Sequence, residues 1–172
     1  MNAPAPRRLV LLRHAKAEHG QLEDLMRPLA LAGRQQAGGV GASLSREGLV
    51  PEHVVCSGAV RTRQTWDLAR AALTGAPETV DVNDDLYLAG VRQVLEILRG
   101  VRDDVSTVLV VGHEPVMSQT AATLAGPGSD EAVLDRVRLG VPTASYSVLE
   151  TDAAWSGLEP DAARLLRLVT PA

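Results

Sequence analysis

Three short apolar segments, each followed at once by polar or cationic residues, constrain the fold of this chain more than any other feature. They occupy residues 8–14 (RLVLLRH), 53–57 (HVVCS) and 106–112 (STVLVVG). Short runs rich in branched side chains are typical of strands that are buried on both faces. The segments at 29–47 and 59–73 place apolar residues at helical spacing. Strands that alternate with helices predict an α/β fold, a three-layer α/β/α sandwich around a mostly parallel sheet.

The middle of the chain continues this alternation. We expect a strand at 79–82, a loop at 86–90 and an amphipathic helix at 91–101. Pro115 lies where the first turn of a helix accepts proline, because that position needs no N–H donor. The helix that starts there should end near residue 125.

The C-terminal part of the chain departs from the alternation. Residues 126–142 (GPGSDEAVLDRVRLGVP) predict an irregular segment, and strands are expected at 145–150 and 165–170. Two consecutive strands suit an antiparallel extension of the sheet. A chain of 172 residues is the length of one domain. We expect that domain to span 8–172, after a disordered tail at 1–7.

Composition and charge exclude several classes of protein. Apolar residues make up 45% and charged residues 22% of the chain, which is typical of a globular protein and not of a disordered one. No apolar run reaches the roughly 18 residues of a membrane span, and no signal peptide is recognisable. Cys56 is the only cysteine, which excludes an internal disulfide and predicts a cytoplasmic location. A net charge of −4 argues against nucleic-acid binding. Separately, we expect the protein to be a monomer.

The ends of three predicted strands carry most of the residues that could do chemistry. Arg13 and His14 follow the first strand, Ser57 ends the second with Arg61 one turn into the next helix, and His113 follows the third. Open α/β sheets bind ligands beyond the carboxyl ends of their strands, where helix N-termini add N–H groups. The pattern therefore predicts a small cationic pocket for an anion within an acidic protein.

Three motifs in this order resemble those of the histidine phosphatase, or phosphoglycerate mutase-like, superfamily. They are RHA at 13–15, SGAVRTRQT at 57–65 and GHEP at 112–115. The segments LLRHAKAE and DLMRPLALAG, together with the short chain, are similar to SixA-type phosphohistidine phosphatases. Ala15 stands where the wider superfamily has glycine, and alanine is the usual alternative in the SixA-type branch.

The resemblance implies a mechanism that needs neither metal nor cofactor. His14 would attack phosphorus as a neutral imidazole and form a phosphohistidine intermediate that water hydrolyses. Arg13 and Arg61 would neutralise the phosphoryl oxygens, and His113, if protonated, would stabilise charge on them. Arg27 corresponds to a loop arginine over the mouth of the pocket.

Other residues are secondary candidates around the phosphoryl group. The general acid stays open between Glu114, which follows His113, and Asp84 or Asp85, which a turn could equally explain. Ser57, Lys16 and Thr143 are candidate substrate-binding residues. The segment 126–142 could fold over the site or leave it open.

Three functions are compatible with these residues. The first is a phosphatase that removes phosphate from phosphohistidine on a protein. The second is a phosphomonoesterase of the same fold that acts on a small phosphorylated sugar or metabolite. The third is a phosphate-binding regulatory module with little catalytic activity, which the complete set of cationic residues disfavours.

Overall fold

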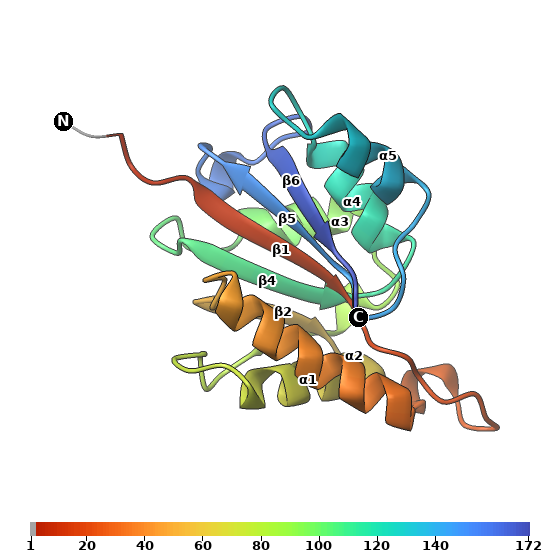
Figure 1. The fold of residues 1–172 in the computed structure, drawn as a ribbon. Helices are drawn as coiled ribbons and strands as arrows, with labels where there is room; N and C mark the ends of the chain where they lie inside the picture. The colour runs from red at the N-terminus through yellow and green to blue at the C-terminus, as the bar shows by residue number, and fades with distance from the viewer. Residues whose placement is uncertain (1–2) are drawn as a thin grey trace.

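A six-stranded sheet runs through the centre of the computed structural model, which describes residues 3–172 (Figure 1). The strands are β1 (Arg7–Arg13), β2 (His53–Ser57), β3 (Asp81–Asn83), β4 (Thr107–Gly112), β5 (Tyr146–Thr151) and β6 (Arg164–Val169). Their order in the sheet is β3-β2-β4-β1-β5-β6. The first four pair in parallel, and two antiparallel pairings add β5 and β6. The predicted sheet, mostly parallel with an antiparallel C-terminal extension, is confirmed.

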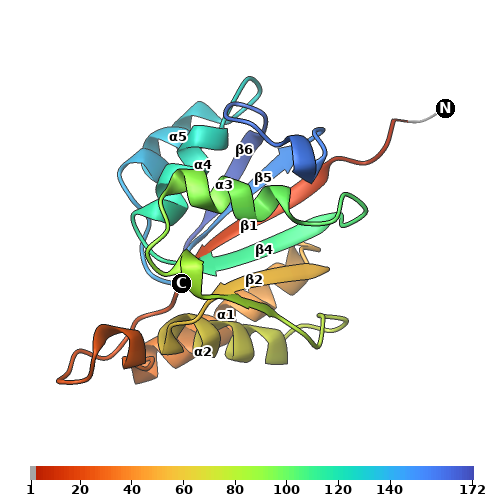
Figure 2. The same cartoon turned by 180° about the vertical axis from the view of Figure 1, so that it is seen from behind.

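Helices cover both faces of the sheet, which confirms the three layers (Figures 1 and 2). Helices α1 (Leu31–Arg46) and α2 (Val60–Ala71) pack on one face. Helices α3 (Val91–Arg99), α4 (Val116–Leu124) and α5 (Glu131–Arg138) pack on the other. Single turns of 3-10 helix lie in the connections, namely η1 (Asp24–Met26), η2 (Asp84–Leu86) and η3 (Trp155–Gly157).

The alternation of side chains along β1 produces two separate apolar cores. Leu9 and Leu11 belong to the core beneath α3, α4 and α5, whereas Val10 and Leu12 belong to the core beneath α1 and α2. All six residues of β4 are buried, as expected of a central strand. Burial raises the pKa of the Cys56 thiol in β2 to about 12, so this cysteine is a packing residue and not a nucleophile.

Several predicted boundaries need correction. The segment 126–142 is not irregular throughout, because it contains α5, whose N-terminus is capped by Asp130. The loop predicted at 86–90 includes the end of η2. Pro115 lies just before α4, which begins at Val116.

The predicted N-terminal tail is also shorter than expected. Arg7 already pairs with Thr151 as the first residue of β1. Met1 and Asn2, the start of that tail, lie outside the described residues.

Candidate active site

The carboxyl ends of the central strands bring the two histidines together. Arg13 and Gly112, the last residues of β1 and β4, pair across the sheet. The next residue of each chain segment is a histidine, and the backbone N–H of His14 donates to the carbonyl of Gly112 at 3.0 Å. The imidazole rings of His14 and His113 lie 5.4 Å apart between centroids. The predicted convergence of these strand ends is thus present in the structure.

The hydrogen bond of His14 defines which of its ring nitrogens is free. Nδ1 lies 2.7 Å from the carbonyl oxygen of Ala15, and because a carbonyl only accepts, Nδ1 must carry the proton. Burial, reinforced by the positive charges of Arg61 and Arg13, lowers the pKa of His14 to about 4. At neutral pH the ring is therefore neutral, with an unprotonated Nε2.

His113 is held in a neutral form of the opposite tautomer. Its Nδ1 lies 3.4 Å from an Nη of Arg61, which can only donate, so Nδ1 accepts. Its Nε2 then carries the proton and donates to Ser57 Oγ at 2.8 Å. Burial, followed by the neighbouring His14 and Arg61, lowers the pKa of His113 to about 3. The protonated His113 considered from sequence is therefore not the form that the pocket holds without a bound anion.

Two guanidinium groups border the histidines, that of Arg61 buried and that of Arg13 half-buried. Arg61 is only 5% exposed and donates through Nη1 and Nη2 to the carbonyl and carboxylate of Asp24, at 2.6 and 3.0 Å. Arg13 donates through Nη1 to the carbonyl of Val141 at 2.8 Å. The Nε–H of each arginine is buried without a partner. Each guanidinium carries five N–H donors, more than the protein acceptors named above, so both arginines can still donate to an anion.

Asp24 and Tyr87 complete the mouth of the pocket, and the sequence analysis missed both. Asp24, in η1, accepts from the hydroxyl of Tyr87, from Arg27 Nε and Nη2 at 2.9 and 2.8 Å, and from Arg61. The hydrogen bonds from Tyr87 and Arg27 hold the pKa of Asp24 well below its usual range. The Tyr87 ring lies edge-on to His113, with centroids 5.3 Å apart. The only sequence signal was the spacing of three between Asp24 and Arg27.

Glu114, one of the candidate general acids, is occupied elsewhere. Its carboxylate accepts from the backbone N–H and the hydroxyl of Ser118, both at 2.8 Å, and from the N–H of Val141 at 3.1 Å. These bonds tie the first turn of α4 to the segment that supplies the carbonyl partner of Arg13. Glu114 is therefore placed as a positioning residue.

The remaining candidates lie around the pocket rather than in it. Lys16 is exposed. The Thr143 hydroxyl faces α1, 3.5 Å from the side-chain oxygen of Gln36. Asp84 is exposed and packs against Gly58, where an added Cβ would lie 2.1 Å from its carboxylate. The neighbouring Asp85 is also exposed, and neither carboxylate accepts a hydrogen bond from Arg13, Arg61 or His113.

Most of the segment at 126–142 is taken up by α5, which packs against α4 and β6 (Figure 1). Only the residues after α5 approach the site, where the carbonyl of Val141 meets Arg13.

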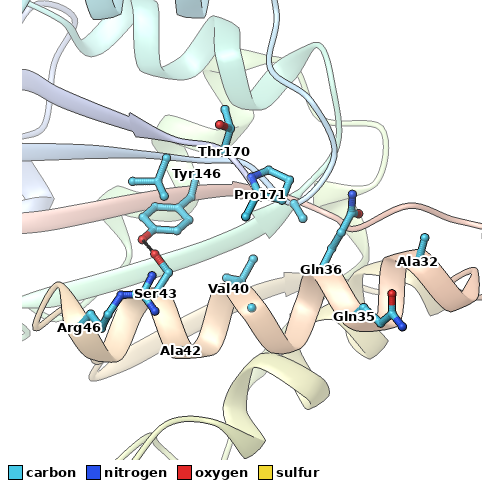
Figure 3. Close-up of a pocket in the computed structure, with 14 residues that line it drawn as sticks. Ala32, Gln35, Gln36, Val40, Ala42, Ser43, Arg46, Tyr146, Thr170 and Pro171 are labelled. Atoms are coloured by element: carbon cyan, nitrogen blue, oxygen red, sulfur yellow. Dashed lines mark hydrogen bonds between the residues drawn. The ribbon is translucent and has the colours of Figure 1, made fainter.

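A separate groove of about 530 Å³ lies between α1 and residues 170–172 (Figure 3). The hydroxyls of Ser43 and Tyr146 form a 2.6 Å hydrogen bond in it, and neither histidine lines it. Arg46 is the one cationic side chain along its walls. The groove thus offers no nucleophile and no cluster of cations for an anion.

Residues 3–172 contain neither a candidate metal site nor a candidate membrane-spanning helix. No group of three or more His, Cys, Asp or Glu side chains in that range could hold a metal ion. Over the same residues, no helix combines the length and apolar character needed to cross a membrane.

Comparison with known proteins relates the chain to relatives of its own length. It is 37% identical, over 162 residues, to an uncharacterized protein of Mycobacterium tuberculosis strain H37Rv, which covers 93% of this chain and 99% of the relative. A solved structure of a candidate phosphohistidine phosphatase SixA from Nakamurella multipartitia has a TM-score of 0.87 and 33% identity, covering 99% of both chains. A candidate SixA from Agrobacterium tumefaciens has a TM-score of 0.78 and 26% identity, covering 97% of this chain and all of that one. No protein-family model matches the chain.

Proposed function

The chain belongs to the histidine phosphatase superfamily, and from that premise we propose that it is a metal-independent phosphatase that hydrolyses phosphohistidine on a protein, with His14 as nucleophile. The observation that carries the proposal is the state of His14. It is neutral, its Nδ1 proton is held by Ala15, and Nε2 is unprotonated beside two guanidinium groups with unused N–H donors. This is the arrangement that a nucleophilic imidazole requires.

The first chemical step forms a bond from His14 Nε2 to phosphorus as the bond to the leaving nitrogen breaks. The phosphoryl oxygens would accept from the guanidinium groups of Arg13 and Arg61, which compensate their charge as it develops. The planar guanidinium suits this purpose better than an ammonium group. Water then attacks phosphorus, releases inorganic phosphate and restores the neutral His14.

The carboxylates near the pocket favour a leaving group that needs no proton from the protein. Asp24 stays ionised, because its hydrogen-bond donors lower its pKa, and Glu114 uses its oxygens to hold Ser118 and Val141. A departing alkoxide needs a proton donor, whereas the imidazole of phosphohistidine, when protonated on its other ring nitrogen, leaves neutral. A phosphoramidate therefore fits this pocket better than a phosphate ester. The names of the two solved relatives point to the same substrate class.

The test is phosphate release, in the presence of a chelator, from a phosphohistidine peptide and from a panel of sugar phosphates. We expect wild type to prefer the peptide and His14→Ala to be inactive, with His19→Ala, a change at an exposed histidine, as the matched control. Rapid quenching should trap an acid-labile, base-stable phosphoryl group that depends on His14.

The alternative outcomes separate the competing functions. Much faster turnover of a sugar phosphate would assign a small-molecule phosphomonoesterase instead. Equal inactivity of wild type and His14→Ala on every substrate would leave a phosphate-binding module.

A further inference from the structure

The exposed apolar side chains of this protein gather around the active site. Within residues 3–172, seven large hydrophobic side chains are exposed, and six of them lie in segments that border the pocket. We call these six the apolar ring; they are Leu22, Leu25, Met26, Leu31, Leu88 and Leu139. The seventh, Val82, lies on the edge strand β3.

The position of five ring residues follows from a neighbour that contacts the pocket, and Leu22 lies two residues before Asp24. Leu25 and Met26 share η1 with Asp24, which binds Arg61. Leu88 follows Tyr87, whose hydroxyl donates to Asp24.

Leu139 and Leu31 are also close in sequence to residues that contact the pocket or follow His14. Leu139 precedes by two residues Val141, the carbonyl partner of Arg13. Leu31 begins α1 directly after Ala30, whose N–H donates to the carbonyl of Lys16, two residues beyond His14. These segments lie beyond the carboxyl ends of the parallel strands (Figure 1).

Such a distribution is not what solvation alone produces. Single exposed apolar side chains are normal on a globular protein, but their concentration around one polar pocket marks a surface that binds another molecule. Leu88 and Leu139 are 86% and 90% exposed, so a small phosphorylated metabolite bound at the histidines would leave most of their surface in water. They would touch a macromolecule that brings its phosphoryl group into the pocket.

The charge beside the ring indicates the chemistry of that macromolecule. A hollow of about 560 Å³ adjoins the pocket at Tyr87 and is lined by the carboxylates of Asp84, Asp85 and Glu96. Leu88 and Ile97 also line it. Glu96 is paired with Arg92 at 3.4 Å, whereas within residues 3–172 no ion pair involves Asp84 or Asp85. A lysine or arginine side chain matches such a hollow, because its aliphatic stem packs on apolar groups while its charge meets the carboxylates.

We propose that the apolar ring and the acidic hollow together form the docking surface for a protein whose phosphohistidine is flanked by apolar side chains and by a lysine or arginine. The proposal rests on the proposed function and names its partner class. The cationic pocket binds the phosphoryl group, the hollow binds the basic side chain, and the ring buries the apolar surface between them.

The test compares two substrates that contain the same phosphorus–nitrogen bond. One is histone, a basic protein, phosphorylated on histidine with phosphoramidate, and the other is free phosphohistidine, which brings no surface. We expect the double change Leu88→Ser and Leu139→Ser to lower kcat/KM on the protein about tenfold, mainly through KM. Hydrolysis of free phosphohistidine should be unchanged, and Val82→Ser, the matched control, should change neither.

The acidic hollow has its own variant. Asp85 is exposed, and Asp85→Asn should raise KM for the phosphorylated histone and weaken the dependence of KM on salt. Unchanged kinetics of this variant on the histone, with unchanged salt dependence, would overturn the assignment of the hollow.

The outcomes distinguish the docking surface from the proposed function. If wild type hydrolyses neither substrate, the proposed function fails. If wild type is active and the ring variants lose nothing on the histone, or lose equally on both substrates, the docking surface alone is overturned. Circular dichroism would show whether the double variant folds. If it does not fold, the single change Leu139→Ser replaces it in the same comparison of the two substrates.

Discussion

Acid should destabilise the folded protein through His14 before most carboxylates titrate. Burial, with the charges of Arg61 and Arg13, lowers the pKa of His14 from 6.5 to about 4 in the folded chain. In the unfolded chain this imidazole is exposed to water and keeps its ordinary pKa. Between about pH 6.5 and pH 4 the unfolded chain therefore binds a proton that the folded chain does not. The free energy of unfolding must therefore fall as pH falls through this window. Above about pH 6.5, His14 is neutral in both states and lowers the free energy of unfolding no further.

The size of the effect follows from the difference between the two pKa values. The pKa drops from 6.5 to about 4, and each unit is worth about 1.36 kcal/mol, so the loss approaches about 3 kcal/mol at pH 4. A domain is commonly stable by only about 5–15 kcal/mol, so this loss should be easy to measure. His113 adds a loss of similar size over the same window, because its pKa falls from 6.5 to about 3 in the folded chain. Both wild type and a His14 variant keep His113, so the difference between them isolates His14.

Urea denaturation at pH 7, 5 and 4, followed by tryptophan fluorescence, measures this loss. Trp66 and Trp155 are buried in the cores on opposite faces of the sheet, so the signal reports both halves of the fold. Between pH 7 and pH 4, wild type should lose about 3 kcal/mol more than His14→Asn, which has no proton to gain. His19→Asn, at an exposed position, should follow wild type. Parallel curves for wild type and His14→Asn would refute the buried, neutral state of His14.

Three further changes test the groups around His14. Arg61→Lys should weaken inhibition by inorganic phosphate at least about tenfold, because an ammonium group cannot bind Asp24 and also present a separate N–H to the anion; an unchanged inhibition constant would contradict this. Asp24→Asn should lower kcat on free phosphohistidine about tenfold by releasing Arg61, and Asp24→Glu should restore part of it. Gly33→Ala should destabilise the fold by about 2 kcal/mol in thermal unfolding, because the new Cβ would lie 1.9 Å from the carbonyl oxygen of Lys16. Gly39→Ala, with nothing within 4 Å, is its matched control and should not destabilise.

The residues at strand ends were predictable because parallel strands have a fixed geometry. Once Arg13, Ser57 and His113 are placed at the ends of parallel neighbours, the sheet itself brings them to one edge. Chain order and apolar pattern were sufficient for that step. The protonation state of His113 was not, because it depends on burial and on contacts with Ser57 and Arg61 that span more than fifty residues.

Helix α5 shows why local pattern underestimates a short helix. Its eight residues follow Gly126, Pro127 and Gly128, which suggest an irregular segment. An isolated helix of this length is unstable in water, so it forms because Val137 is buried against the core that α4 and β6 share. The cap provided by Asp130 was visible in the sequence, but the packing was not.

The role of Asp24 in holding Arg61 could not be predicted from the sequence for a different reason. That reason also links the catalytic site to the docking surface. Its partners Arg61 and Tyr87 are 37 and 63 residues away. The resemblance placed Arg27 of the same segment over the pocket mouth, but it did not indicate that Asp24 would bind both partners. The segment folds so that one side of η1 faces the pocket, where Asp24 holds Arg61, while Leu25 and Met26 stay exposed on η1. A protein that presses on these two side chains therefore presses on the element that orients the guanidinium. Docking and the alignment of Arg61 should then be coupled, so that ring substitutions in η1 change kcat as well as KM on a protein substrate, whereas Leu139→Ser changes KM alone.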